Sequence, residues 1–205
     1  AMSCAIDPTE QICAWSYVSN SSTDGKADRL IIYNYATQKW SYAEVAAELL
    51  APFFTAGYTL EGLDNLAANL DALPAPLDSN LYKGGAFLFG GAKDNKIFAF
   101  TGNPLAATIE TGEFFLQQGK HGIINRSVPY FRGGTVTMQI GSRDRQDDTV
   151  TFSDANSLTD EGFVQHRAQG RFHRVRMNIA NATSPTSNWE FAQGVDVEGH
   201  VLGRR

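Results

Sequence analysis

Residues 28–42 read Asp-Arg-Leu-Ile-Ile-Tyr-Asn-Tyr-Ala-Thr-Gln-Lys-Trp-Ser-Tyr, and this stretch decides the fold. It predicts a β-hairpin, because an apolar run at 30–35 is followed by a polar turn at 36–39 and a second strand that opens with Trp40. The first strand is rich in Ile and Tyr on both faces, so we expect both faces to be covered. A hairpin with a tryptophan just past its turn recurs in β-propeller blades, which favours a repeated structural architecture over a catalytic one.

The composition and the charge of the chain suit a β-rich globular protein rather than a nucleic-acid binder. The 205 residues are 42% hydrophobic and 11% aromatic, and 19 glycines supply the turns that many short strands need. Residues 1–102 hold six Lys or Arg against eleven Asp or Glu, whereas residues 103–205 hold eleven of each. Because an acidic chain is repelled by the phosphate backbone, we do not expect nucleic acid as a partner.

Arginine replaces lysine almost completely in the second half, where ten of the eleven basic residues are Arg. Arg171, Arg174 and Arg176 lie close together, with Arg167 nearby, and two interpretations remain open. We favour a cross-strand Arg/Asp ladder, since arginine pairs with carboxylates in fixed geometry. The alternative is an exposed basic stripe that contacts phosphate. Arg174 and Arg176 are therefore candidate interface or ligand contacts.

Residues 59–79 form the segment with helix-like spacing of apolar residues. Its leucines recur at intervals of three and four, and Pro74 and Pro76 prevent a long helix. We expect one short helical segment near residues 60–73, laid over the sheet as a helix or as successive turns. A partner-binding helix is the alternative. Elsewhere in this half we expect strands at residues 10–18, 85–89 and 96–101, a turn-rich connection at 90–95, and a helical turn at 46–51 that Pro52 stops.

The second half shows short strands with turns about every ten residues. Residues 135–140 and 171–179 alternate strictly between apolar and polar side chains, so one face of each strand is buried, and His173 lies on such a face. Other strands are expected at residues 107–116, 123–131, 150–152 and 189–197. We therefore expect an all-β chain with propeller-like antiparallel hairpins over residues 1–102 and a β-sandwich-like terminal domain over 103–205.

The sequence holds no residue pattern that predicts catalysis, a cofactor or a metal site. The four histidines lack a metal-ligand spacing, and the charged stretch 142–148 differs from a calcium-binding loop, so we interpret it as a solvated strand end. Cys4 and Cys13 match no CxxC motif; we expect free buried thiols, with a bond across a hairpin as the alternative. No run approaches the ~20 apolar residues of a membrane span.

Several segments, in their order along the chain, resemble a family of uncharacterised bacteriophage and prophage virion proteins. These segments are residues 5–9, 15–17, 29–35, 39–41, 59–64, 77–79, 97–102, 107–113, 141–145, 170–176 and 192–197. The resemblance implies the C-terminal portion of a longer, propeller-containing component of the tail or head-to-tail apparatus. It brings no catalytic residues and no cofactor. It implies a virion location after synthesis in the host cytoplasm, with other virion proteins and copies of the same chain as partners.

The leading hypothesis is thus a non-enzymatic virion structural protein that acts through subunit interfaces with Arg/Asp rims. An exposed Trp or Tyr patch would support such an interface. The alternative is a glycan-binding module of a phage tail, in which Trp189, Tyr130 and Phe131 form an aromatic platform for a host-surface glycan. A third hypothesis, a depolymerase, needs two carboxylates in one cleft. The aromatic residues expected in cores are Trp15, Tyr33, Tyr35, Trp40 and Trp189.

Overall fold

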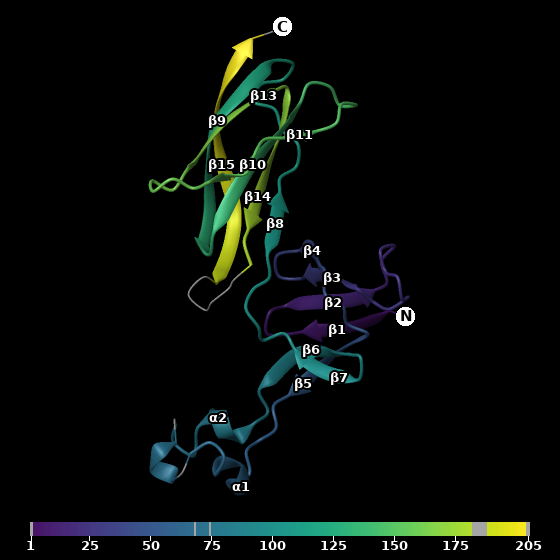
Figure 1. The fold of residues 1–205 in the computed structure, drawn as a ribbon, viewed down its shortest axis with the longest axis vertical. Helices are drawn as coiled ribbons and strands as arrows, with labels where there is room; N and C mark the ends of the chain where they lie inside the picture. Colours follow the sequence, from purple (N-terminus) through teal and green to yellow (C-terminus); the bar gives the residue numbers. More distant parts are fainter. Residues whose placement is uncertain (1, 68, 74, 182–187, 204–205) are drawn as a thin grey trace. The chain divides into compact units, whose positions relative to one another are not determined.

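The computed structural model describes residues 2–67, 69–73, 75–181 and 188–203. The chain is predominantly β, with antiparallel sheets that do not close on themselves, as the sequence predicts for the fold class. It forms two compact units, which we call unit 1 (Ala1–Gly102) and unit 2 (Asn103–Arg205) (Figure 1). Each unit is described by itself below.

Unit 1 begins with a four-stranded antiparallel meander, in which each strand pairs with the next one along the chain. Its strands are β1 (Ser3–Asp7), β2 (Ile12–Tyr17), β3 (Arg29–Asn34) and β4 (Lys39–Ala43). The hairpin predicted from residues 28–42 is confirmed as β3 and β4, which pair in register from Leu30 opposite Ala43 to Asn34 opposite Lys39. Strand β4 has no partner on its other side in this sheet and is therefore an edge strand.

A second, three-stranded sheet of unit 1 contains β5 (Leu49–Phe54), β6 (Phe87–Lys93) and β7 (Lys96–Ala99). The helical turn predicted at residues 46–51 is wrong, because β5 runs through Pro52, which lies opposite Phe89. Proline is tolerated there because β5 is an edge strand of this sheet. On the side of β5 that has no partner strand, a residue without an N–H costs no hydrogen bond of the sheet. The connection predicted at residues 90–95 is also shorter: Asp94 and Asn95 alone make the turn, both with positive φ.

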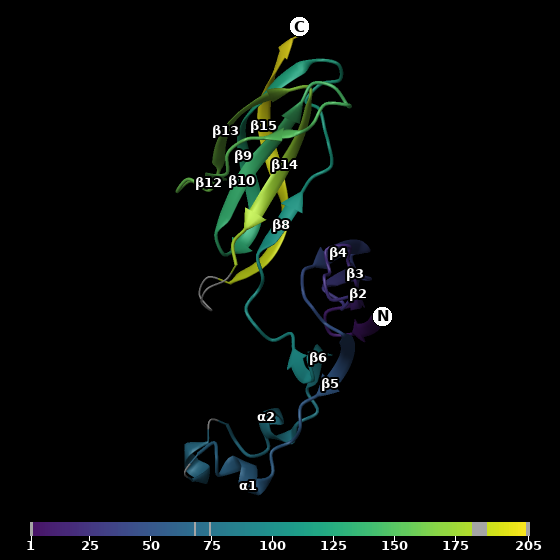
Figure 2. The same ribbon diagram turned by 45° about the vertical axis from the view of Figure 1, so that its right-hand side comes forward.

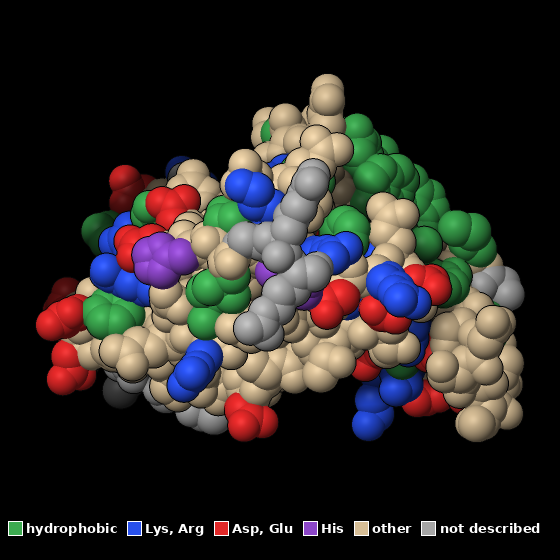
Figure 3. Space-filling model, turned by 90° about the horizontal axis from the view of Figure 1, so that it is seen from above, with side chains coloured by type: hydrophobic (Ala, Val, Ile, Leu, Met, Phe, Trp, Pro, Cys, Tyr) green, Lys and Arg blue, Asp and Glu red, His purple; other side chains and the backbone are tan. Residues whose placement is uncertain are grey.

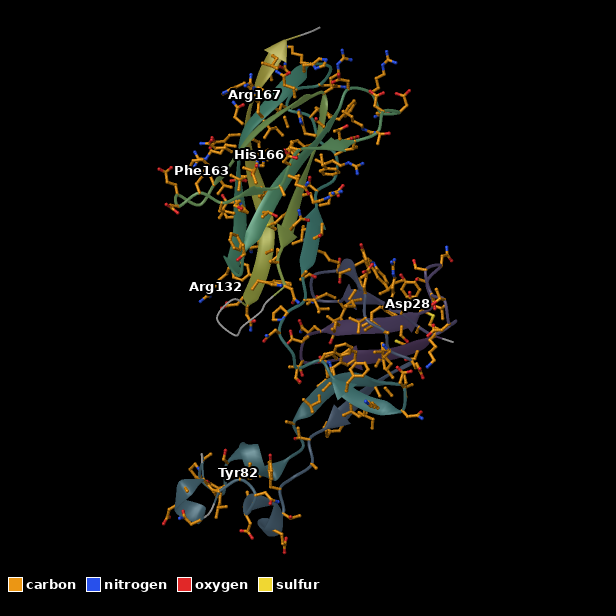
Figure 4. All side chains as sticks on the ribbon, in the orientation of Figure 1. Asp28, Tyr82, Arg132, Phe163, His166 and Arg167 are labelled. Carbon is orange, nitrogen blue, oxygen red and sulfur yellow. The ribbon has the colours of Figure 1, made fainter. Side chains whose placement is uncertain are left out.

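The segment between β5 and β6 folds into short helical pieces, so of the two forms expected near residues 60–73 the structure has successive turns rather than one helix. These pieces are α1 (Leu60–Leu63), the 3-10 turn η1 (Leu70–Ala72) and α2 (Asn80–Lys83). Thr59 caps α1 by accepting a hydrogen bond from the Gly62 amide. Tyr82 is buried and its hydroxyl bonds to the Ala75 backbone, which ties the end of the segment to its middle (Figure 4). Pro74 lies outside the described residues.

Unit 2 contains two antiparallel sheets that share one hydrophobic core (Figure 2). One sheet has the order β11-β10-β14-β8, with β12 also pairing β10, and the other has the order β13-β9-β15. The strands are β8 (Ala107–Glu110), β9 (His121–Gly133), β10 (Val136–Arg143), β11 (Thr151–Phe152), β12 (Asn156–Ser157), β13 (Val164–Gly170), β14 (Phe172–Ile179) and β15 (Trp189–Gly203).

The strict alternation predicted for β10 and β14 is confirmed. Val136, Met138 and Ile140 are buried on β10, and the odd-numbered residues 173–179 are buried on β14. Strand β13 was not predicted, although its burial alternates in the same way. Besides Val164, its inward residues are His166, Ala168 and Gly170, which are polar or small, so the sequence pattern gave little signal there.

Candidate functional site

The meander sheet of unit 1 has two unlike faces. Its inner face carries aliphatic and small side chains, because Ala5, Ala14 and Leu30 pack with Leu50 of β5 in a compact core. Strand residues alternate between faces, so the residues between them in sequence must point to the opposite side. The aromatic side chains of this sheet are therefore on the side away from its core.

We call the outer side of the meander the aromatic face and define it by six of its large side chains. The register places Trp15 opposite Ile31, and it places Ile31 and Tyr33 opposite Tyr42 and Trp40, so these residues share one side of the sheet. Trp40 is 66% exposed and Tyr42 is 69% exposed, which means that nothing among the described residues covers this end of the face. The aromatic face consists of Ile6, Trp15, Ile31, Tyr33, Trp40 and Tyr42.

The rings of the aromatic face stack on one another across three strands. The centroids of Trp15 and Trp40 are 5.8 Å apart with an angle of 29° between the ring planes. Tyr33 and Trp40 are closer, at 4.6 Å and 34°. Such offset pairs hold each other in fixed orientations and contribute about 0.5–1.5 kcal/mol each. The face is therefore an ordered aromatic surface rather than a set of separate mobile side chains.

This arrangement corrects the prediction that the unit 1 aromatics lie in a core. Trp40 and Tyr35 are exposed, whereas Trp15 and Tyr33 are half-buried mainly against neighbouring rings. The expectation that both faces of the hairpin are covered is wrong for the same reason: the core lies on one side of the sheet only. In the view of Figure 3, a group of hydrophobic side chains (green) lies at the surface, at the upper right.

The two cysteines also lie on strands of this sheet. Both are free thiols, Cys4 exposed and Cys13 half-buried, so the expectation of buried thiols is wrong for Cys4. Cys4 lies opposite Trp15 and Cys13 opposite Ile6, which puts both on the outer side of the sheet but not directly across from each other. The register therefore explains why they are not bonded.

Charge is almost absent from the aromatic face and collects elsewhere in unit 1. Lys26 Nζ lies 2.7 Å from Glu48 Oε1 and 2.8 Å from Asp94 Oδ1, and these carboxylates hold the pKa of Lys26 above its usual range. Asp28 accepts hydrogen bonds from the hydroxyl and the amide of Ser19, which lower its pKa (Figure 4). These carboxylates line one pocket together with Lys26, which pairs with two of them, and Lys93.

The three aromatic residues proposed for a glycan platform in unit 2 do not meet on one surface. Phe131 and Trp189 are half-buried and pack against the core, and Trp189 Nε1 donates a hydrogen bond to the Leu105 carbonyl at 2.9 Å. Tyr130 is 49% exposed, and its hydroxyl donates to Asp196 Oδ2 at 2.6 Å, which raises the Tyr130 pKa. Because Tyr130 and Phe131 are consecutive in a strand, their side chains point to opposite faces.

Arg174 and Arg176 belong to a ladder of ion pairs, as the favoured interpretation predicted, although the partners are glutamates rather than aspartates. Arg174 Nη1 is 3.2 Å and Arg176 Nη2 is 3.0 Å from the carboxylate of Glu110. Burial by itself would raise the Glu110 pKa, but the hydrogen bonds from both arginines outweigh it and lower that pKa. Arginines that are already paired are poor phosphate ligands, so the basic-stripe interpretation loses its basis.

A second ion pair, further along the same sheet, organises the charged stretch after β10. Arg143 donates to both carboxylate oxygens of Glu113, each at 2.6 Å, and its remaining nitrogen bonds to the carbonyls of Gln146 and Asp148. The Arg143 guanidinium holds the Glu113 pKa below its usual range. The stretch 142–148 is therefore a strand end fixed by an arginine.

A buried Ser–His contact in unit 2 was missed at the sequence level. Ser127 Oγ lies 2.8 Å from His166 Nε2, with both residues buried between β9 and β13 (His166 is labelled in Figure 4). Hydrogen-bonded Ser and His side chains form part of nucleophilic sites, but such a site must be open to substrate. This pair is enclosed in the core. His173 is buried as predicted, and burial lowers the pKa of both histidines.

Comparison with known proteins assigns no function to the chain. No protein-family model and no curated protein matches the chain. Within the described ranges, no helix is long and apolar enough to cross a membrane, and no cluster of three or more His, Cys, Asp or Glu side chains is arranged to hold a metal ion. The functional argument therefore rests on the geometry of the chain itself.

Proposed function

We propose that this chain is a non-enzymatic structural component of a bacteriophage virion that works by assembly, through subunit interfaces. One observation carries the assembly role: a meander sheet covers one side with its own aliphatic core and leaves its stacked aromatic rings on the other side. Tryptophan and tyrosine are the residues most enriched in the centres of protein interfaces. A sheet built this way stabilises an assembly more than it stabilises its own unit.

The location in the tail or the head-to-tail apparatus rests on the sequence resemblance. The four-stranded meander of unit 1 agrees with a propeller-like blade, and the two sheets of unit 2 that share one core agree with a β-sandwich-like terminal domain. The ion pairs of unit 2 support an assembly role as well, since they stiffen one exposed side of a sheet without forming a substrate cleft.

The location is tested by immunogold labelling of phage particles purified from the strain that encodes the chain. We expect antibodies raised against the full chain to label the tail or the head-to-tail region. Labelling of the capsid surface would contradict the proposed location and would place the chain in the capsid instead. A chain that is abundant in the lysate and absent from purified particles would overturn the proposal.

A further inference from the structure

We propose that the aromatic face docks against the same face of a second copy of this chain, giving a two-fold symmetric dimer held by two stacked sheets. This inference rests on the proposed assembly function and names its partner. Three properties of the face carry it: the distribution of bulk between the two sides of the sheet, the exposed area, and the absence of net charge.

The distribution of bulk argues that the outer side is built to be covered. Sheets that pack face to face fill the roughly 10 Å between them with large side chains. On the inner side Ala5, Ala14 and Leu30 are already covered by the core, whereas the outer side presents Trp15, Trp40 and Tyr42. A covering layer on the outer side would therefore bury the largest side chains of this sheet.

The exposed area matches a small but specific dimer. Trp40 and Tyr42 are about two-thirds exposed, so with side chains of roughly 150–250 Å² they present about 300 Å² together. Ile6, which is 54% exposed, and the half-buried residues bring the face to about 500 Å², an apolar patch as large as monomeric proteins ordinarily show. Two copies would bury about 1,000 Å² in total, the lower limit for a specific interface.

The charge of the face favours a second copy over other partners. Within the described strands, Arg29 is the charged residue on this side, and Glu44 neutralises it at 3.0 Å. Unit 1 as a whole carries six basic against eleven acidic residues, so two copies repel each other on most approaches. They can meet without like-charge repulsion at the neutral aromatic face. A strongly charged partner would find no complementary group there.

A two-fold contact of this kind closes on itself. Each copy contributes the same patch, so the contact saturates at two copies and does not grow into a filament. Because the buried area is near the lower limit, we expect a dissociation constant of about 10–100 µM in isolation. In a virion, neighbouring contacts would raise the effective concentration far above that value.

Sedimentation velocity of the full chain over a concentration series tests the inference. The wild-type chain should pass from 22.4 kDa at low concentration to twice that mass, with a midpoint in the range given above. Tyr42→Glu places a charge in the most exposed part of the neutral contact, and we expect it to raise the dissociation constant at least about tenfold. Tyr42 is 69% exposed, so the variant should keep the far-ultraviolet circular dichroism of the wild type.

Ile97→Glu is the matched control, because Ile97 is 74% exposed in unit 1 but lies on β7, outside the aromatic face. It should dimerise like the wild type. Tryptophan emission should shift to shorter wavelength with concentration in the wild type and in Ile97→Glu, but not in Tyr42→Glu.

Three outcomes would overturn the inference. One is a wild-type chain that stays monomeric throughout the series. Another is a dimer that Ile97→Glu weakens as much as Tyr42→Glu does. The third is a monomer whose tryptophan fluorescence is quenched by maltohexaose, which would replace the second copy by a glycan. A monomeric chain found in labelled virions would end this inference and leave the proposed function standing.

Discussion

Leu30→Ala is the substitution that most directly tests the assignment of the two sides of the meander sheet. Leu30 is 3% exposed on β3 and lies among Ala5, Ala14 and Leu50. Truncation removes three carbon groups from this core, and at about 0.8 kcal/mol each the transfer cost alone is about 2.4 kcal/mol. The cavity left in the core adds to this transfer cost and raises the total to about 3–4 kcal/mol.

The assay is urea denaturation of the full chain at low micromolar concentration, followed by tryptophan fluorescence, since Trp15 and Trp40 report on unit 1. Tyr42→Ala is the comparison on the opposite side of the same sheet. Its side chain is mostly exposed, so we expect it to lower the free energy of unfolding by less than about 1 kcal/mol. If Tyr42→Ala cost as much as Leu30→Ala under these conditions, the outer side would be a folded core, and the reasoning about an uncovered face would be refuted.

Three further predictions concern the rest of the chain. The two buried histidines of unit 2 have a pKa lowered by burial, so the unfolded state takes up protons first and stability should fall as pH drops below about 6.5; urea midpoints at pH 7.5 and 5.5 measure this, and an unchanged midpoint would contradict it. Asn95 has a φ of +59°, so Asn95→Gly should leave stability nearly unchanged while Asn95→Val lowers it by about 1–2 kcal/mol in the same assay; equal effects would argue against the turn. Glu113→Gln removes one of the two hydrogen bonds that Glu113 accepts from Arg143, together with the opposite charge, and should lower the thermal midpoint more than Glu190→Gln, whose ion pair is exposed; a reversed order in calorimetry would count against a stabilising role of the Arg143–Glu113 pair.

The sequence by itself determined the elements whose periodicity is strong. Strict alternation located β10 and β14 with the correct buried faces, including His173, and the apolar run ending at a polar turn located the hairpin of β3 and β4. Where the signal was weak the predictions failed. Pro52 suggested a stop but lies in an edge strand, and His166 lies on a strand whose inward residues, apart from Val164, are polar or small. Whether a proline or an alanine fits into a strand depends on the neighbouring strand, and a local sequence pattern carries no information about that strand.

Only the tertiary structure decided which side of each sheet is covered. Periodicity separates the residues of a strand into two sets, but when both sets are apolar it does not say which set meets the core. In β3 and β4 the set without aromatic residues faces inward, so Tyr33 and Trp40 became the aromatic face instead of a core. In unit 2 the pairing of β9 with β15 sent Phe131 and Trp189 toward the core and Tyr130 to the opposite side, which dispersed the expected platform. Exposure depends on contacts between strands distant in sequence, and those contacts exist only once the chain has folded.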